Sequence, residues 1–362
     1  MTLRWVIAGG GTGGHVTPAL ALGEAIRERG DEVLFMGSDR GLEARLLPQA
    51  GFDWVALGSR QVMGRGVLGR TAGVCSILAA TLRAHRELRR FAADRLISVG
   101  GYASMPAVLA SVFSRVPLAL LEPNAVPGRS SRIAARLAKR VFVGFRVTAD
   151  RLGVRPDRVR CFGVPLRQSL VAAFGGAEPR REPAPPFHLL VFGGSQGARQ
   201  INEAVMDALP RLADAPIEVF HQAGDADRER VAAAYAKSGV TAEVVAFEPN
   251  MPARYRWADL ALCRAGGLTV AELALAGLPA LLVPYPHAAD DHQAANAHEL
   301  EVAGAARMLN SRSFNADALA AALLPLLETP EELARMGAAA GRLSRPEAAR
   351  HIVDECAGMR EV

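Results

Sequence analysis

The sequence of 362 residues has few cysteines, few aromatic residues and no long apolar run. Its four cysteines are far apart and lack the spacing of metal ligands, so we expect free thiols in a reducing compartment. No uninterrupted apolar run reaches the roughly 18 residues that a membrane span requires. The N-terminal segment leads directly into an expected strand and loop and lacks the pattern of a signal peptide. Together these absences favour a cytoplasmic enzyme.

The basic residues are almost all arginine, and the net charge is +5. With three Trp and four Tyr, and no basic patch interleaved with aromatic residues, the sequence does not favour nucleic-acid binding. Residues 59–95 combine arginines and apolar residues with few acids. This predicts either a solvated helix face with a loop or a surface that contacts anionic lipid. The arginines of this segment are Arg60, Arg65, Arg70, Arg83, Arg86, Arg89, Arg90 and Arg95.

Apolar, β-branched runs alternate with helical patterns along the whole chain, which is typical of parallel strands buried on both faces. Each half therefore predicts a doubly wound α/β sheet, and two facing sheets would form a cleft for a substrate. A Pro- and Gly-rich charged segment at 174–186 marks the change between the halves. The expected strands cover residues 5–10, 32–37, 53–57, 95–100, 117–122, 140–145 and 159–163, then 188–194, 217–224, 242–247, 259–266, 279–286 and 305–309.

Three glycine-rich loops follow expected strands. The first glycine-rich loop is residues 9–15 (GGGTGGH), the second is residues 193–199 (GGSQGAR) and the third is residues 100–104 (GGYAS). Glycine lets backbone N–H groups approach a phosphate closely, and a following helix N-terminus adds partial positive charge. We expect Pro18 to begin the helix after the first loop. Three such loops at strand ends favour phosphate binding over simple turns.

Two other motifs allow different interpretations. Gly9, Gly11 and Gly14 fit the dinucleotide pattern G-x-G-x-x-G, and Asp39 lies where a ribose-binding acid would stand. An oxidoreductase is disfavoured, however, because the second half supplies its own loop and its own acid. Residues 225–227 (DAD) match the D-x-D pattern that holds a metal in one class of sugar-transferring enzymes, but an acid at an expected helix start is explained by the helix dipole. We therefore expect no metal.

Several segments together resemble the MurG family of family 28 glycosyltransferases. They are GGGTGGHVTPAL, GGSQGARQIN, HQAG, CRAGGLTVAEL, AGLPA and PYPHAADDHQAANA, and they span essentially the whole chain. The resemblance implies an α/β fold of the GT-B type, with two Rossmann-like domains facing a cleft. It implies inverting transfer of N-acetylglucosamine from UDP-N-acetylglucosamine to lipid I, the undecaprenyl-linked muramoyl pentapeptide, in peptidoglycan synthesis. A nucleotide-sugar epimerase of similar fold and another glycolipid glycosyltransferase are the alternatives.

The resemblance also implies a domain plan and a place in the cell. Residues 1–164 would bind the acceptor and the membrane, residues 165–340 would bind the donor, and residues 341–362 would form a helix that packs back on the first domain. The hinge is expected near residues 163–167. Such an enzyme binds peripherally to the anionic cytoplasmic face of the plasma membrane, needs no cofactor, and meets proteins of cell-wall synthesis and division.

For the donor, the resemblance implies that Glu272 accepts both ribose hydroxyls and that the backbone of Glu248 contacts the uracil edge. Arg167 would pair with donor charge, which suits its forked, permanent cation. Gln293 would bind the sugar hydroxyls, with His292 as a second candidate. The expected donor-binding residues are Thr12, Gly13, Gly14, Asn124, Arg167, Ser195, Gln196, Glu248, Gly267, Leu268, Thr269, Val270, Glu272 and Gln293.

Inverting transfer needs a base for the proton of the acceptor 4-hydroxyl. His15 is one candidate, because imidazole titrates near the working pH, and Glu122 is its rival. His15 could instead merely orient its loop. The expected acceptor-binding residues are Gly11, Gly101, Tyr102 and Ser104. On this side the chain departs from the family pattern at residues 121–124 (LEPN) and 130–132 (SSR), where the family often has HEQN and TNK.

Overall fold

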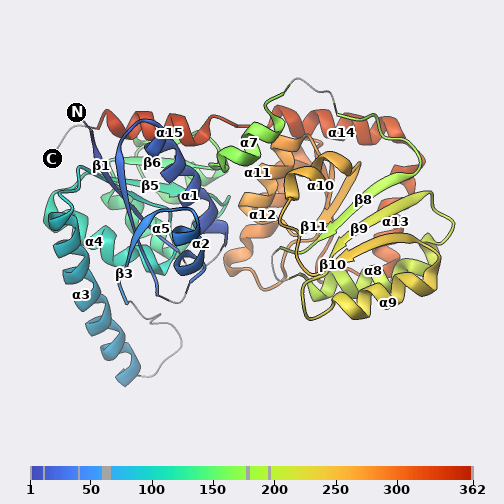
Figure 1. The fold of residues 1–362 in the computed structure, drawn as a ribbon, viewed down its shortest axis with the longest axis horizontal. Coiled ribbons are helices and arrows are strands. Elements are labelled where there is room, and N and C mark those ends of the chain that lie inside the picture. Colours follow the sequence, from blue (N-terminus) through green and yellow to red (C-terminus); the bar gives the residue numbers. More distant parts are fainter. Residues whose placement is uncertain are drawn as a thin grey trace. The chain divides into compact units, whose positions relative to one another are not determined.

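The structure is a computed structural model that describes residues 2–10, 13–39, 41–58, 67–176, 180–194 and 197–359, without the side chains of residues 67–75. The chain divides into two compact units. The first unit comprises Met1–Gln168 and Arg345–Val362, and the second comprises Ser169–Ser344. In each unit, helices flank a sheet (Figure 1). The assignment of these units to acceptor and donor stays a prediction.

Within the described residues, the first unit holds a parallel seven-stranded sheet in the order β3-β2-β1-β4-β5-β6-β7. All of the strands expected in the first half are confirmed. The strands are β1 (Arg4–Ala8), β2 (Glu32–Gly37), β3 (Asp53–Ala56), β4 (Arg95–Ser98), β5 (Leu118–Glu122), β6 (Arg140–Val143) and β7 (Val159–Cys161). The helices are α1 (Gly13–Glu28), α2 (Glu43–Gln49), α3 (Val67–Arg90), α4 (Met105–Ser114), α5 (Arg129–Leu137), α6 (Val147–Leu152) and α15 (Ala348–Ala357).

The second unit, over its described residues, holds a parallel six-stranded sheet in the order β10-β9-β8-β11-β12-β13, and its expected strands are confirmed as well. The strands are β8 (Phe187–Phe192), β9 (Ile217–Gln222), β10 (Thr241–Val245), β11 (Leu260–Cys263), β12 (Ala280–Leu282) and β13 (Ala306–Met308). The helices are α7 (Gln168–Phe174), which begins at the boundary between the units, α8 (Arg199–Leu212), α9 (Arg228–Ser238), α10 (Met251–Trp257), α11 (Gly267–Ala276), α12 (His292–Val302), α13 (Ala316–Leu327) and α14 (Pro330–Arg342).

The sheet of the first unit is buried on both faces, as the continuous apolar runs predict. Successive residues of a strand point to opposite faces. Val6 and Ala8 therefore join a core with residues of α3, α4 and α5. Trp5 and Ile7 join a second core with residues of α1, α2 and α15. The two cores fix β1 in the centre of the sheet, so the loop after it has a rigid support.

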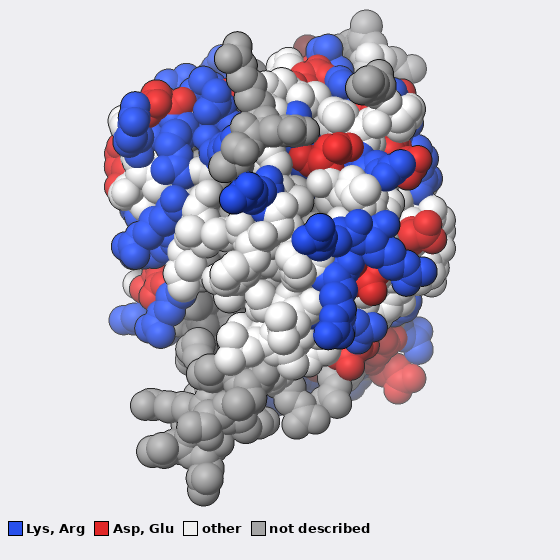
Figure 2. All heavy atoms as spheres, turned by 90° about the vertical axis from the view of Figure 1, so that its left-hand side faces the viewer, with Lys and Arg blue, Asp and Glu red and all other residues white. Residues whose placement is uncertain are grey.

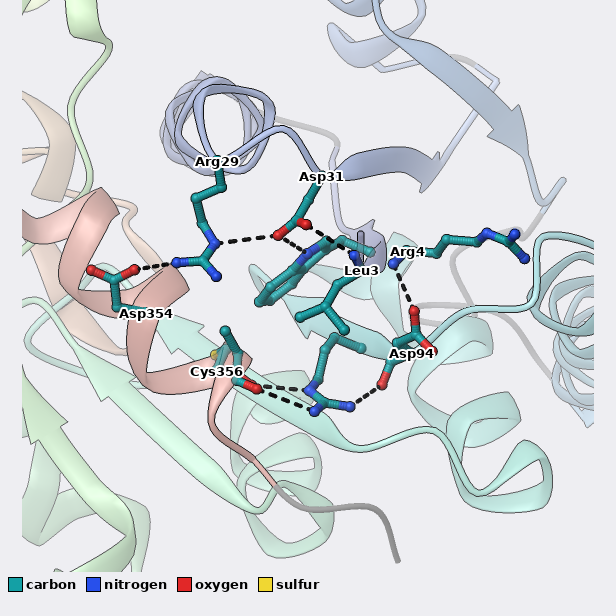
Figure 3. Close-up of polar contacts among 10 residues, drawn as sticks. Leu3, Arg4, Arg29, Asp31, Asp94, Asp354 and Cys356 are labelled. Carbon is teal, nitrogen blue, oxygen red and sulfur yellow. Dashed lines mark hydrogen bonds and ion pairs between the residues drawn. The ribbon is translucent and has the colours of Figure 1, made fainter. Parts of the chain in front are cut away.

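Helix α15 is the last in the sequence, yet it packs against α1 of the first unit. Arg29 joins the two helices: its Nε lies 3.2 Å from Asp31 Oδ2 and its Nη1 lies 2.6 Å from Asp354 Oδ1 (Figure 3). Asp31 also accepts hydrogen bonds from the main-chain N–H of Leu3 and the indole N–H of Trp5. The carboxylate thus connects the start of β1 to Arg29, and through Arg29 to α15.

Arg95 caps the C-terminal end of α15. Its guanidinium is nearly buried and donates to the main-chain carbonyls of Cys356 at 3.0 Å, Ala357 at 3.2 Å and Met359 at 2.5 Å. The last carbonyls of a helix have no intrahelical partner, and a cation near them also favours the helix dipole. Arg95 therefore provides hydrogen-bond donors to helix-end carbonyls whose burial without a partner would lower stability.

The expectation that Pro18 begins the first helix is wrong, because α1 begins at Gly13 and contains Pro18 in its interior. The first N–H groups of any helix lack intrahelical partners, so glycines in the first turn sacrifice no intrahelical hydrogen bond of their own N–H groups. Pro18 only forgoes a bond to the carbonyl of Gly14. As a result, Gly13 and Gly14 place their N–H groups at the helix N-terminus itself.

Candidate active site

The second glycine-rich loop connects β8 to α8 in the second unit. Its Ser195 and Gln196 lie outside the described residues. Gly194 and Gly197 have φ angles of +101° and +75°, which other residues rarely adopt. A Cβ atom on Gly197 would come within 2.0 Å of the carbonyl oxygen of Ala223. The loop therefore needs glycine both for its conformation and for its close approach to the turn after β9.

Beside this loop lies a cavity of about 660 Å³. This volume is within the usual range for small-molecule sites. Its walls come from the glycine loop, the start of α8, the start of α11, the segment after β12 and the start of α12. The lining residues are Gly193, Gly197, Ala198, Arg199, Gln200, Arg264, Gly266, Thr269, Tyr285, Pro286, His287 and Gln293. We call it the donor cavity, after the prediction that this part of the chain binds the donor.

The start of α11 forms one wall of the donor cavity. Gly266 is the N-cap, with ψ of 145°, and the expected donor residues Gly267, Leu268, Thr269 and Val270 make the first turn. Gly266 and Thr269 line the cavity, whereas Gly267 and Val270 are buried. Because the first turn of a helix presents N–H groups and partial positive charge, this wall suits an anion such as a diphosphate.

Glu272 lies one turn further along α11 and is held by a tyrosine. Tyr255 of α10, which is 1% exposed, donates a hydrogen bond of 2.7 Å to Oε2 of Glu272. Burial raises the pKa of Glu272 to about 7, and the bond from Tyr255 partly opposes this rise. The carboxyl can therefore gain or lose its proton near neutral pH.

Glu248 follows β10, and its side chain is engaged within the protein. The carboxylate accepts from the Asn250 main-chain N–H at 2.7 Å and from Arg254 Nε at 2.8 Å. Burial opposes ionisation, but these two donors outweigh it and lower the pKa of Glu248. Its own main-chain N–H donates to Oε1 of Gln222 at 2.8 Å. The main-chain N–H of Glu248 is thus held by Gln222, and its side chain is held by Asn250 and Arg254.

Gln293, rather than His292, lines the donor cavity. The Oε1 atom of Gln293 accepts from the Tyr285 main-chain N–H at 2.9 Å, whereas the ring of His292 bonds to the carbonyl of Ala289. Just before them, Asp290 and Asp291 have φ angles of +52° and +50°. Two successive left-handed residues that are not glycine store strain, which often marks a functional segment.

Arg264 is a cavity residue that the sequence reasoning did not assign. Its Nη1 donates at 3.1 Å to Gln200 Oε1 and to the carbonyls of Val283 and Pro284, and its guanidinium lies 5.5 Å from the ring centre of Tyr285. Burial lowers its pKa. The signal was an arginine directly after a buried strand and before the glycines of α11, a place where a cation faces the ligand side of such a sheet.

In the first unit, His15 lies near the third glycine-rich loop. Gly11 and Thr12 of the first loop lie outside the described residues. A Cβ atom on Gly100 would be 3.4 Å from Cδ2 of the His15 ring, and one on Gly101 would be 2.9 Å from the carbonyl oxygen of Gly10. Gly100 and Gly101 also have positive φ angles. These glycines therefore let the first and third loops and the imidazole meet closely.

The other residues expected on the acceptor side differ in exposure. Glu122 is 2% exposed, and its Oε1 accepts from both the main-chain and the side-chain nitrogen of Asn124, at 3.0 and 3.2 Å. The buried hydroxyl of Ser104 donates to the carbonyl of Gly101 at 2.9 Å. Tyr102, in contrast, is 40% exposed. Ser104 thus supports the third loop, while Tyr102 is free to meet a ligand.

Arg167 belongs to the first unit and pairs with an acid there. Its Nε and Nη2 donate to Oε1 of Glu24 on α1 at 3.0 and 2.9 Å, and the main-chain N–H of Gln168 donates to Oε2. In this structure Arg167 thus takes part in an internal ion pair, and its bond to donor charge stays a prediction. The structure groups Gln293 and the first turn of α11 around one cavity in the second unit, and it groups His15 with Gly101 in the first.

Two negative findings concern the described part of the chain. Within it, no helix is long and apolar enough to cross a membrane. Nor do the described side chains include a cluster of three or more His, Cys, Asp or Glu residues that could hold a metal ion. The carboxylate of Asp227, from the motif at residues 225–227, accepts instead from Asn202 and Arg230, both at 2.9 Å.

Two units that each hold a doubly wound parallel sheet, with a glycine-rich loop and a helix start around a cavity in the second, define the class as a two-domain protein of the GT-B fold. A model of the glycosyltransferase family 28 N-terminal domain matches residues 5–143, and a model of the family 28 C-terminal domain matches residues 188–352. The chain belongs to glycosyltransferase family 28.

A relative from Nitratidesulfovibrio vulgaris is 46% identical over 358 residues, which cover 97% of this chain and 96% of the relative. It is named UDP-N-acetylglucosamine–N-acetylmuramyl-(pentapeptide) pyrophosphoryl-undecaprenol N-acetylglucosamine transferase. The crystal structure of Acinetobacter baumannii MurG is similar with a TM-score of 0.82 at 31% identity, covering 99% of this chain and 100% of that one. A UDP-GlcNAc 2-epimerase from Neisseria meningitidis reaches a TM-score of 0.67 at 14% identity, covering 98% and 99% of the two chains, which shows a shared fold alone.

Proposed function

We propose that this protein transfers N-acetylglucosamine from UDP-N-acetylglucosamine to the 4-hydroxyl of N-acetylmuramic acid in undecaprenyl-pyrophosphoryl-muramoyl-pentapeptide, with inversion at the anomeric carbon. The observation that carries this proposal is the match over 97% of the chain to a relative named for that transfer. The donor cavity supports it, because its size and its helix starts suit a nucleotide diphosphate sugar. The product is lipid II for peptidoglycan synthesis.

In this proposal the second unit binds the donor. The first turn of α11 and the second glycine-rich loop, including Ser195 and Gln196, hold the diphosphate, and Gln293 binds the sugar. Glu272 accepts from the ribose hydroxyls, and the segment at Glu248 contacts the base. The first unit adds Thr12, Gly13, Gly14, Asn124 and Arg167 toward the donor, and Gly11, Gly101 and Tyr102 toward the acceptor pyrophosphate.

The reaction is a single displacement. The 4-hydroxyl oxygen attacks the anomeric carbon on the face opposite UDP, and the bond from that carbon to the β-phosphate oxygen breaks. His15 takes the hydroxyl proton. We favour it over Glu122 because His15 is half-buried near a helix N-terminus, whereas Glu122 is buried and accepts hydrogen bonds from Asn124. UDP leaves with the bonding electrons, stabilised by helix N-termini and cationic side chains.

The test is to incubate the protein with radiolabelled UDP-N-acetylglucosamine, with and without a lipid I analogue. We expect UDP release that depends on the analogue, together with one N-acetylglucosamine added to its muramoyl 4-hydroxyl. UDP release that is independent of the analogue, or the appearance of an epimerised sugar nucleotide, would contradict the proposal.

The first unit also offers a surface for the membrane that carries such an acceptor. Helices α3 and α4 pack side by side and expose large apolar side chains. On this side of the molecule, an uncharged area is bordered by Lys and Arg (Figure 2). The exposed apolar residues of α3, α4 and α5 are Leu78, Leu82, Val112, Phe113, Ile133 and Leu137. The exposed arginines of the same region are Arg83, Arg86, Arg89, Arg90, Arg115, Arg129, Arg132 and Arg136.

An apolar area bordered by cations fits the interface of an anionic membrane, where each nearby arginine contributes about 1 kcal/mol. We assign this surface, which we call the α3–α4 patch, to peripheral binding at the cytoplasmic face of the plasma membrane. Arg60, Arg65 and the side chain of Arg70, from the arginine-rich segment of the sequence, lie outside the described residues. We include proteins of cell-wall synthesis and cell division as partners in the same proposal, since they use lipid II.

A further inference from the structure

Gln222 stands at the end of the central one of three neighbouring strands. It is the last residue of β9, paired with Phe192 of β8 on one side and with Val245 of β10 on the other. The second glycine-rich loop follows β8, and the segment that contains Glu248 follows β10. Gln222 is 3% exposed, so its side chain amide must find its partners within the protein.

The two ends of that amide bond to the two segments. Nε2 donates to the main-chain carbonyl of Gly194 at 2.8 Å, and Oε1 accepts from the main-chain N–H of Glu248 at 2.8 Å. The amide orientation is determined by these neighbours, because a flipped amide would face donor with donor and acceptor with acceptor. One side chain therefore connects the glycine loop to the loop after β10.

The turn that carries Gln222 is itself held firmly. The N–H groups of Ala223 and Gly224 donate to the carbonyls of Val245 and Ala246. The carbonyl of Ala223 accepts from Nδ2 of Asn202 on α8 at 2.9 Å. With both sides of the turn bonded, a displacement of one segment is transmitted to the other through Gln222 rather than absorbed by the turn.

We propose that Gln222 is a positioning residue that couples the diphosphate-binding loop to the base-contacting segment, so that the two ends of UDP bind cooperatively. This inference rests on the proposed function, in which the second unit holds UDP-N-acetylglucosamine. Without the bridge, each segment must be ordered separately when the nucleotide binds, and affinity for the intact nucleotide falls more than affinity for its nucleoside part.

The test compares Gln222→Met, which keeps the length but has no hydrogen-bonding amide, with Gln49→Met, an exposed glutamine of α2 that serves as the control. Calorimetry measures the Kd of UDP and of uridine, and steady-state assays measure kcat and the KM for UDP-N-acetylglucosamine. We expect Gln222→Met to weaken UDP binding about tenfold or more, to raise KM similarly, and to leave kcat near that of the unmodified protein. Uridine binding should change much less.

Gln222→Glu provides a second, independent readout. A protonated glutamic acid can donate to Gly194 and accept from Glu248, whereas the ionised form cannot donate. Its UDP affinity should therefore recover as pH falls, relative to the unmodified protein, and this variant decides the matter if Gln222→Met does not fold. The inference is overturned if UDP and uridine lose affinity equally in Gln222→Met, or if the UDP affinity of Gln222→Glu does not depend on pH. If the unmodified protein binds no UDP, it is the proposed function that fails, and the coupling fails with it.

Discussion

The hydroxyl of Tyr255 donates a 2.7 Å hydrogen bond to Oε2 of Glu272 and so joins α10 to α11. Burial raises the pKa of Glu272 to about 7, and the bond from Tyr255 works in the opposite direction. Burial also raises the pKa of Tyr255 well above its ordinary value, so the phenol remains a donor at every working pH. The tyrosine therefore favours the ionised carboxylate, which is the form that accepts best from two hydroxyls.

Donor binding should depend on pH through this pair. In the unmodified protein, the KM for UDP-N-acetylglucosamine should fall as pH rises through about 7 and Glu272 ionises. Tyr255→Phe removes the bond that stabilises the carboxylate, so the midpoint should move upward by about one pH unit. Tyr235→Phe, which removes another buried hydroxyl of the same unit, is the control. A KM profile of Tyr255→Phe identical to that of the control would contradict this role.

Glu272 should also make the free protein less stable at higher pH. Its pKa in the folded protein, about 7, exceeds the ordinary 4.5, so its contribution to stability is fully present below about pH 4.5 and is lost as pH rises through 7. Glu272→Gln stays neutral at every pH. Relative to the unmodified protein, this variant should gain about 1–3 kcal/mol of unfolding free energy between pH 5 and pH 8.

Urea unfolding without ligand at the two pH values measures this gain. The matched control is Glu229→Gln, because the Glu229 side chain is 89% exposed. An equal difference between Glu272→Gln and the unmodified protein at both pH values would show that burial does not control the proton of Glu272. The same variant should bind the donor more weakly, which separates its effect on stability from its effect on function.

The identity of the base can be tested by paired substitutions. His15→Ala should lower kcat by roughly 10²–10⁴-fold, the usual contribution of a general base. Glu122→Gln keeps the hydrogen bonds to Asn124 in part and should cost less than tenfold if it only positions that amide. The pH profile of kcat provides the check, since its acidic limb should disappear in His15→Ala. The opposite ranking of the two variants would move the proton transfer to Glu122.

The α3–α4 patch should govern binding to vesicles. Phe113 is 74% exposed and Leu82 is 59% exposed, so a charge at either site should leave the fold intact. Phe113→Glu together with Leu82→Glu should reduce binding to vesicles that contain anionic lipid by about tenfold or more. Val302→Glu, on an exposed residue of the second unit, is the control. Activity on a water-soluble acceptor should remain, and equal vesicle binding by both variants would contradict the assignment.

The cap on α15 should matter more than the neighbouring surface ion pair. Arg95→Met removes three hydrogen bonds to the carbonyls of Cys356, Ala357 and Met359, two of them buried, and should lower the unfolding free energy by about 2–4 kcal/mol. Asp354→Ala removes only the partly exposed pair with Arg29, leaves the pair of Arg29 with Asp31 in place, and should cost about 0–1 kcal/mol. Thermal or urea unfolding of both variants decides between them. Similar losses would mean that the helix end finds other partners.

The sheets were predictable because each strand is a short, continuous apolar run and parallel strands leave that pattern. The start of α1 was not predictable in this way. The first N–H groups of a helix have no intrahelical partner, so Gly13 and Gly14 can form its first turn, whereas the sequence suggested a start at Pro18. Arg264 was missed since its place in the cavity wall follows from contacts with Gln200 and the segment after β12, which lie far away in the sequence.

Resemblance to a family predicted donor-binding roles for the residues of α11 and for Gln293, but it could not show which residues hold them in place. The partner of Glu272 is a tyrosine from the preceding helix, and the partner of Arg167 is Glu24, 143 residues earlier. Such pairs depend on how elements pack, which local patterns do not encode. The same is true of Gln222, whose role arises from the order of β8, β9 and β10 in the sheet.

The membership of α15 in the first unit has a consequence for the order of folding on the ribosome. Ile352, Val353 and Cys356 complete a core that begins with Trp5 and Ile7. A nascent chain therefore emerges with residues 169–344 ready to fold, while the earlier-synthesised half still exposes part of its interior. The first unit begins synthesis first but completes its core last. A chain that stops before residue 345 would expose a hydrophobic surface that chaperones and proteases recognise.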